Sequence, residues 1–170
     1  MRTLHRTTAL MAVTGLALTS AAALGLASPA SAKAYECRGV PATIVGTTGH
    51  DDIRGTSGRD VIVALAGNDE IDGRGGNDLI CGGSGHDEIE GGSGHDTIWG
   101  QSGSDEIDGD SGHDRIWGST GHDELAGGTG DDHLSGGRGN DLLEGERGQD
   151  TLRGGAGQDR VYQGEEPDDD

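Results

Sequence analysis

The chain has 170 residues, which is enough for one domain. Its 35 Gly, its lack of Phe and its formal net charge of −19 leave little for a conventional hydrophobic core and exclude nucleic acid as a partner. Two interpretations remain: an acidic disordered chain, or a fold that a bound cation stabilises.

Residues 1–32 have the features of a secretory signal peptide. Arg2 and Arg6 give a positive start, an apolar run follows at 9–26, and a small-x-small pattern ends at Ala32. We expect cleavage after Ala32, with a second candidate site two residues further on. The alternative is a membrane anchor, because the apolar run is near the length that spans a bilayer. We expect the mature chain to be secreted and extracellular, without membrane insertion.

The lead-in at 33–45 ends in a degenerate copy of the nine-residue repeat that follows it. Ile44 stands at the aliphatic position of that copy, but Ala42 replaces the expected Asp, so we expect no metal there. We expect the lead-in to cap the open amino-terminal end of a stack of repeats.

The two cysteines, Cys37 and Cys81, are candidates for a disulfide, because the chain is expected to be exported. Closing such a loop stabilises the fold by about 4 kcal/mol in the chain-entropy model. The bond requires the two Cα atoms to approach within about 7 Å, and two free thiols are the alternative.

Residues 46–162 divide into thirteen consecutive blocks of nine without an insertion, such as GGSGHDEIE at 82–90. The first position is Gly except at Ala64, the fourth is always Gly, the sixth is always Asp and the eighth is Ile, Leu or Val. Positions seven to nine alternate polar, apolar and polar, which is typical of a short strand, and the first six positions are rich in turn formers. So strict a period indicates units that bury apolar surface only by stacking on one another.

Strand, turn, strand and turn make one coil of 18 residues, with repeats of the same parity stacked in two columns. This predicts an all-β fold: a right-handed parallel β-roll, or β-helix solenoid, with two short-stranded sheets. The aspartates then form two ladders whose mutual repulsion a cation would reverse. Carboxylate and carbonyl oxygens suit Ca²⁺ better than Mg²⁺. The predicted ligands are the side chains of Asp51, Asp60, Asp69, Asp78, Asp87, Asp96, Asp105, Asp114, Asp123, Asp132, Asp141, Asp150 and Asp159, together with loop carbonyls.

At these residues the chain resembles the RTX (repeats-in-toxin) family, the hemolysin-type calcium-binding repeat, whose pattern is G-G-x-G-x-D-x-U-x with U aliphatic. The resemblance implies Ca²⁺ between the loops of repeats i and i+2, which gives up to eleven sites here. Ala64 is expected to strain its loop slightly without losing a site. RTX repeats are often attached to proteases, lipases or toxins, but little chain lies outside the repeats, so we expect no enzyme. The acidic tail at 163–170 is expected to be disordered.

The sequence thus predicts a secreted calcium-binding protein that is unfolded without Ca²⁺. An alternative is a calcium-dependent adhesion module, because Trp99 and Trp117 stack on one outer face and could contact a cell-wall, polysaccharide or protein partner. The pair could instead shield a strand edge. Another alternative is ice binding, because the third position is Ser or Thr in eight of thirteen repeats.

Histidines recur at the fifth position of the repeat: His50, His86, His95, His113 and His122. We expect solvated side chains that point outward. The alternative is a Zn²⁺ or Cu²⁺ site at His95 and His113, which stack as neighbours.

Overall fold

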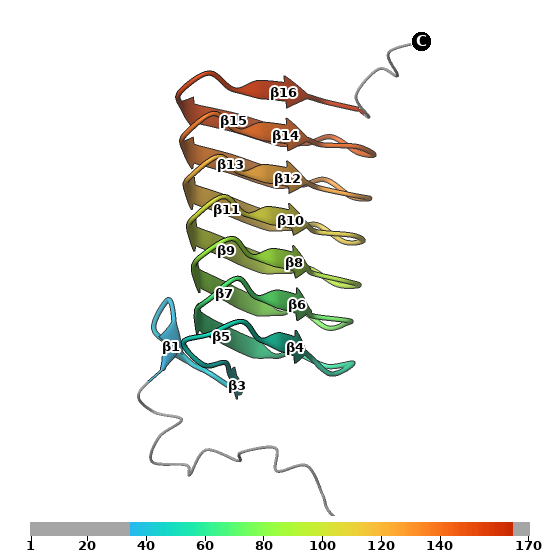
Figure 1. The fold of residues 1–170 in the computed structure, drawn as a ribbon. Helices are drawn as coiled ribbons and strands as arrows, with labels where there is room; N and C mark the ends of the chain where they lie inside the picture. The colour runs from blue at the N-terminus through green and yellow to red at the C-terminus, as the bar shows by residue number, and fades with distance from the viewer. Residues whose placement is uncertain (1–34, 165–170) are drawn as a thin grey trace, which may run out of the picture.

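The computed structural model describes residues 35–164 as an all-β solenoid of about seven coils (Figure 1). Two seven-stranded parallel sheets face each other across a narrow interior. Partner residues in neighbouring coils are 18 apart, as in Ile107↔Leu125, which confirms the predicted coil length. The predicted signal peptide and the end of the tail, 165–170, lie outside the described residues.

One sheet, the long-strand sheet, begins with the two-residue β3 and continues with six-residue strands. Its members are β3 (Ile44–Val45), β5 (Val61–Ala66), β7 (Leu79–Ser84), β9 (Thr97–Ser102), β11 (Arg115–Thr120), β13 (His133–Arg138) and β15 (Thr151–Ala156). The other sheet, the short-strand sheet, has three-residue strands. Its members are β4 (Asp52–Arg54), β6 (Glu70–Asp72), β8 (Glu88–Glu90), β10 (Glu106–Asp108), β12 (Glu124–Ala126), β14 (Leu142–Glu144) and β16 (Arg160–Tyr162).

The longer strands were not anticipated from the repeat. In that sheet the chain stays paired through the first three residues of the next repeat, whereas after each short strand it turns at once and leaves only isolated bridges such as Ser93↔Ser111. Both halves of a coil follow the same nine-residue pattern, so the pattern cannot show which half pairs for longer.

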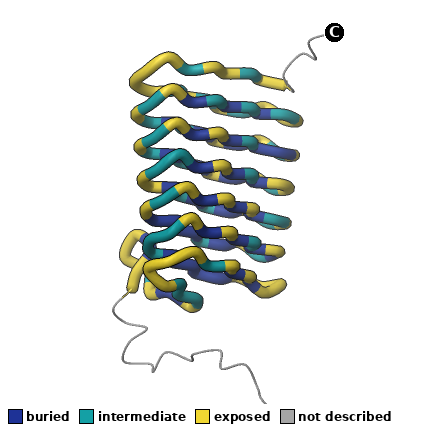
Figure 2. Tube along the Cα trace, viewed as in Figure 1, coloured by how far each residue is buried: buried dark blue, intermediate teal, exposed yellow. Residues whose placement is uncertain are grey.

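The core is a double column of eighth-position side chains between the sheets. Ile98 and Ile116 of one sheet and Ile89 and Ile107 of the other are all at most 1% exposed. Buried residues recur in register along both sheets through most of the stack, whereas residues 146–164 are partly or fully exposed (Figure 2). The eighth-position side chain of the last repeat, Val161, lies at the carboxy-terminal end of the stack and is 45% exposed.

The lead-in divides into two parts. Ile44 and Val45 form β3 and pair in register with β5, so Ile44 occupies the core column as the degenerate repeat predicts. The preceding hairpin, β1 (Glu36–Cys37) and β2 (Val40–Pro41), lies beside the stack against the outer face of the long-strand sheet (Figure 1). Only Ile44 and Val45 lie at the open amino-terminal end of the stack, where a cap was expected. Within residues 35–164, no helix is long and apolar enough to cross a bilayer.

Candidate metal centre

The sixth-position aspartates stand at the end of each loop, directly before or at the start of a strand, and they stack into the two predicted ladders. From Asp51 to Asp141, the backbone N–H of each aspartate donates to Oδ1 of the aspartate one coil further on. For example, the Asp96 N–H donates to Asp114 Oδ1 at 2.7 Å, and the Asp105 N–H donates to Asp123 Oδ1 at 3.1 Å. From Asp69 onward, the ladder therefore fixes the position of each carboxylate by one of its two oxygens.

The second oxygen of these carboxylates is buried and has no hydrogen-bond partner. A buried polar atom without a partner costs about 1–3 kcal/mol, and more when it is charged. Ten Oδ2 atoms, all in the third to the twelfth repeat, share this condition: those of Asp69, Asp78, Asp87, Asp96, Asp105, Asp114, Asp123, Asp132, Asp141 and Asp150.

In several repeats, a carbonyl oxygen of the next coil borders the same space beside the first-position glycine as the free carboxylate oxygen. A Cβ built on Gly91 would lie 3.0 Å from Asp96 Oδ2 and 3.0 Å from the Gly109 carbonyl oxygen of the next coil, and Gly109 repeats the arrangement with Asp114. Within residues 35–164, no group of three or more His, Cys, Asp or Glu side chains forms a metal cluster. A donor set that joins one or two carboxylates with backbone carbonyls is all oxygen, which fits Ca²⁺.

The first two repeats differ from the rest. The backbone N–H of Thr47 donates to Asp51 Oδ2 at 2.6 Å, and that of Thr56 donates to Asp60 Oδ2 at 2.7 Å. From the third repeat onward the second position has a positive φ, as at Arg74 (68°). Branched Thr avoids that region, so its N–H turns toward its own aspartate. These two carboxylates are satisfied without a metal.

Burial raises the pKa of most ladder aspartates, because it removes water from the charged form. The pKa of Asp96 and of Asp123 rises to about 6, and that of Asp105 and of Asp114 to about 7. The hydrogen bond to Oδ1 lowers the pKa, and repulsion within the ladders raises it further, but desolvation dominates. The ladders therefore bind protons in place of a metal more readily than free aspartate does.

The carboxy-terminal end of the ladder is open. Asp141 and Asp159, which belong to successive coils, line a cavity of about 380 Å³ together with Asn140 and Gln158. Asp159 is only partly buried, whereas Asp141 is as buried as the carboxylates in the middle of the ladders.

The invariant fourth-position glycines bring successive loops close together. A Cβ on Gly112, whose φ is +153°, would lie 1.3 Å from the Gly94 carbonyl oxygen. No side chain fits in that space. Ala64, the one exception at the first position, has an ordinary φ, and the left-handed residue in its loop is the next one, Leu65, at 84°.

The fifth-position side chains are exposed, as predicted, but they are not simply solvated. Their acceptor atoms receive the N–H of the fifth position one coil later: His113 N–H donates to His95 Nδ1 at 2.8 Å, and Asp131 N–H donates to His113 Nδ1 at 2.7 Å. The rings of His95 and His113 stack with centroids 5.0 Å apart. This acceptor role was not predicted, although Asn at the same position performs it too, as Asn77 does for His95.

The remaining predicted residues lie on the long-strand sheet. Cys37 and Cys81 form a disulfide with Cα atoms 5.7 Å apart, which fastens the hairpin to β7. Trp99 and Trp117 stack in parallel with centroids 4.8 Å apart. Trp99 is covered on its other face, because the Arg38 guanidinium lies 5.1 Å above the ring.

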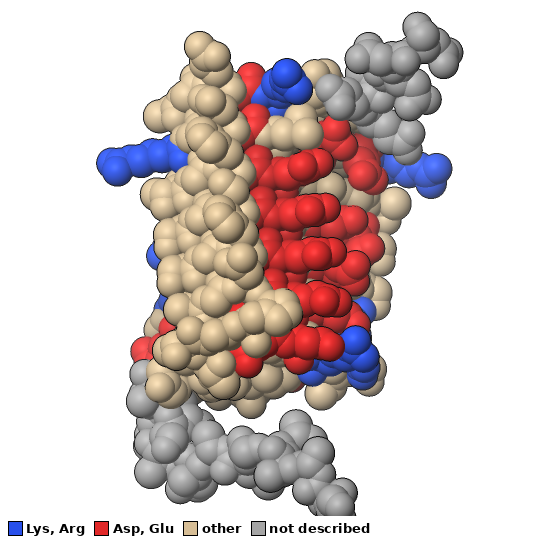
Figure 3. Space-filling view, in the orientation of Figure 1, with Lys and Arg blue, Asp and Glu red and all other residues tan. Residues whose placement is uncertain are grey.

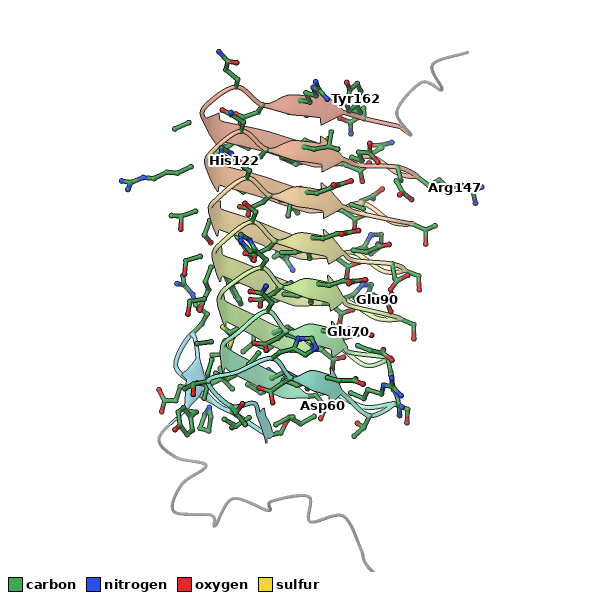
Figure 4. The ribbon with its side chains drawn as sticks, viewed as in Figure 1. Asp60, Glu70, Glu90, His122, Arg147 and Tyr162 are labelled. Carbon is green, nitrogen blue, oxygen red and sulfur yellow. A yellow bond between two sulfur atoms is a disulfide. The ribbon has the colours of Figure 1, made fainter. Side chains whose placement is uncertain are left out.

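A second set of carboxylates was not predicted. The outer face of the short-strand sheet carries acidic side chains in register, such as Glu70, Glu88 and Glu106 (Figure 3). Glu70 and Glu90 project outward from β6 and β8 (Figure 4). The signal was present in the sequence as acidic seventh and ninth positions of the odd repeats. These exposed groups add to the negative potential around the ladders.

Comparison with known families agrees with this geometry. The model of the RTX calcium-binding nonapeptide repeat matches residues 45–80, 82–116, 108–143, 117–152 and 135–165. No curated protein matches the chain.

Proposed function

We propose, from the premise that this chain belongs to the family of the RTX calcium-binding nonapeptide repeat, that it is a secreted, non-enzymatic protein whose coils fold as Ca²⁺ enters their loops. The observation that carries this proposal is the series of ten buried Oδ2 atoms without a partner. Bound Ca²⁺ would supply the positive charge and the oxygen coordination that these atoms lack.

The residues that would hold the ion are the sixth-position aspartates and the loop carbonyls near them. The chain's own part is to hold each carboxylate by Oδ1, leave Oδ2 free, and bring the carbonyl of the next coil beside it. Without the ion, the same packing would bury uncompensated charge, so the stacked coils would be unfavourable near neutral pH.

The first two repeats reduce the expected number of sites. Thirteen repeats taken as i, i+2 pairs give eleven sites, and two of these pairs include Asp51 or Asp60, whose Oδ2 atoms already accept hydrogen bonds. We therefore propose nine calcium sites, which join the third to the thirteenth repeat.

The first test is far-ultraviolet circular dichroism of the mature protein during a Ca²⁺ titration, with Mg²⁺ as the control. We expect a cooperative change from coil to β structure at about 0.1–1 mM Ca²⁺, the range of extracellular modules. A protein that is equally folded without Ca²⁺, or that folds equally well with Mg²⁺, would contradict the proposal.

The number of sites is tested by two matched substitutions. Asp60→Asn and Asp96→Asn make the same chemical change at buried ladder positions, but only Asp96 has an orphaned Oδ2. Equilibrium dialysis should show that Asp96→Asn lowers the amount of bound Ca²⁺ or its affinity, while Asp60→Asn leaves both unchanged. Equal losses would favour eleven sites over nine.

Export is a separate part of the proposal. We propose that residues 1–32 direct secretion and are removed, which leaves a mature chain that begins at Lys33. Amino-terminal sequencing of the protein recovered outside the cell tests this. A cell-associated chain that retains its apolar segment would instead indicate a membrane anchor.

A further inference from the structure

The ninth-position side chains form a stacked column on the outer face of the long-strand sheet. Arg38 covers Trp99, and Trp99 covers Trp117 with an angle of 6° between the ring planes. One coil further on, Ser135 stands in register with Trp117, and one coil beyond it stands Arg153. The column therefore loses one layer at Ser135.

A cavity of about 330 Å³ occupies the position of the missing layer. Trp117 and Arg153 line its two sides, and Ser135 lies in the layer between them. The rest of the lining is Arg115, His133, Leu134 and Thr151. We call this cavity the Ser135 slot. Its volume is at the lower end of the range for ligand pockets, roughly 300–1,000 Å³, so it suits a ligand of about one ring.

The slot is positive although the chain is strongly acidic. Salt bridges in the part of the chain that the structure describes join Arg54 to Asp52 and Arg74 to Asp72, and neither Arg115 nor Arg153 takes part in one. The carboxylates of the short-strand sheet are on the opposite side of the solenoid. Two unpaired guanidinium groups beside an indole face select a ring that carries a negative charge.

We propose that the Ser135 slot binds a hexuronic acid residue of an acidic polysaccharide. The apolar face of the sugar ring would stack on Trp117, and its carboxylate would pair with Arg153 or Arg115. The hydroxyls of Ser135 and Thr151 and the ring nitrogens of His133 supply hydrogen bonds to the sugar hydroxyls. An aromatic carboxylate would use the indole and the guanidinium groups but would leave these three polar groups unused, which favours the sugar.

The proposal changes the role of the two tryptophans. Trp99 is closed in by Arg38 and Trp117, so it supports the column, whereas the far face of Trp117 is the one that meets a ligand. This inference goes beyond calcium binding and requires only that the sheet be formed.

The experiment uses the mature protein in saturating, buffered Ca²⁺, with its fold checked by circular dichroism. Ligand-detected saturation-transfer NMR compares a short hexuronic acid oligomer, the neutral hexose oligomer of equal length, and an indole carboxylate. We expect binding of the uronic acid oligomer and at least about tenfold weaker binding of the neutral one, which corresponds to one charge-assisted hydrogen bond.

Four variants locate the site. Trp117→Ala and Arg153→Gln should each weaken binding about tenfold or more, while Arg138→Gln makes the same charge change outside the slot and should have no effect. Ser135→Trp fills the missing layer, so it should abolish binding while the calcium-induced fold is retained. Binding that survives Ser135→Trp, or a preference for the indole carboxylate or the neutral oligomer, would overturn the proposal. If the unsubstituted mature protein does not fold in Ca²⁺, that result would instead contradict the proposed calcium function.

Discussion

At the residue scale, the spacing between coils rests on the fourth-position glycines. From Gly67 onward, their backbones have positive φ angles and meet the backbone of the previous coil, as Gly112 meets the Gly94 carbonyl. The strict recurrence of Gly at this position could be interpreted from the sequence as a demand for tight turns. The contact between backbones could not be predicted from the sequence, because it appears only once the coils are stacked.

Substituting one of these glycines tests the contact apart from the backbone angle. Gly112→Ala should lower the free energy of unfolding in Ca²⁺ by about 4 kcal/mol or more, because its Cβ would overlap the Gly94 carbonyl. Gly39→Ala is the control, because Gly39 also has a positive φ (+85°) but has no atom within 4 Å of its Cβ position. It should cost only about 1–2 kcal/mol. Urea unfolding at fixed Ca²⁺ measures both, and equal losses would contradict the role of the contact.

At the second position of the repeat, a change to glycine should stabilise the fold instead of destabilising it. Gln101 has a φ of 80°, a region in which Gly is not strained. Gln101→Gly should therefore raise the free energy of unfolding by roughly 1 kcal/mol. The exposed Gln149 has no positive φ, so Gln149→Gly should be neutral or destabilising in the same urea experiment. Destabilisation of similar size in both variants would show that position two carries no strain.

At the element scale, the loops from the third repeat onward are joined by a ladder of side-chain acceptors at position five as well as by the aspartates. The alternation of the strands and the aspartate ladders were predictable, because period nine, taken twice, places equivalent residues in register. The ladder at position five was not, because His, Asn, Ser and Asp share no property in the sequence except an acceptor atom. The Thr47 and Thr56 loops could have been recognised, since β-branched residues occur at position two only there.

The acceptor ladder can be tested at His95. His95→Asn keeps an acceptor for the His113 N–H, as Asn77 already provides one for His95, so stability should change little. His95→Ala removes it and should cost about 0.5–1.5 kcal/mol, the net worth of one hydrogen bond. Thermal unfolding in saturating Ca²⁺ measures both variants, and an alanine variant as stable as the asparagine variant would rule out a structural role for this bond.

At the scale of the whole molecule, we propose that the stability of the fold depends on the ions that neutralise the aspartate ladders. The net charge of −19 and the small apolar content predict that the chain needs a bound cation to fold, and the family match shows that its repeat is the RTX calcium-binding repeat. The position of the hairpin could not be predicted, because the lead-in has only one degenerate copy of the repeat and its contacts with Val61, Val63 and Trp99 depend on the finished sheet.

Protons should partly replace the metal. The folded-state pKa of Asp105 and Asp114 is about 7, above the ordinary value of 3.8, so the folded chain binds more protons than the unfolded chain between these values. The stability of the metal-free coil is therefore greatest below about pH 4 and falls as the pH rises through 6 to 7. Circular dichroism of the metal-free protein should show more β structure at about pH 5 than at pH 8. With Ca²⁺ present the dependence reverses, because protons compete for the same oxygens, and the calcium midpoint should rise as the pH falls. A metal-free signal that is the same at both pH values would contradict the burial of the ladders.

The disulfide also sets how the molecule would respond to force. If the two ends of the calcium-loaded chain are pulled apart, the exposed carboxy-terminal coil has a neighbour on one side only and should detach first. Each further coil of 18 residues then adds about 60 Å of contour length. Unravelling stops at Cys81, because its bond to Cys37 prevents the 44-residue segment between them from being extended. A single-molecule pulling trace should therefore show regular steps and a maximum length that increases when the bond is reduced.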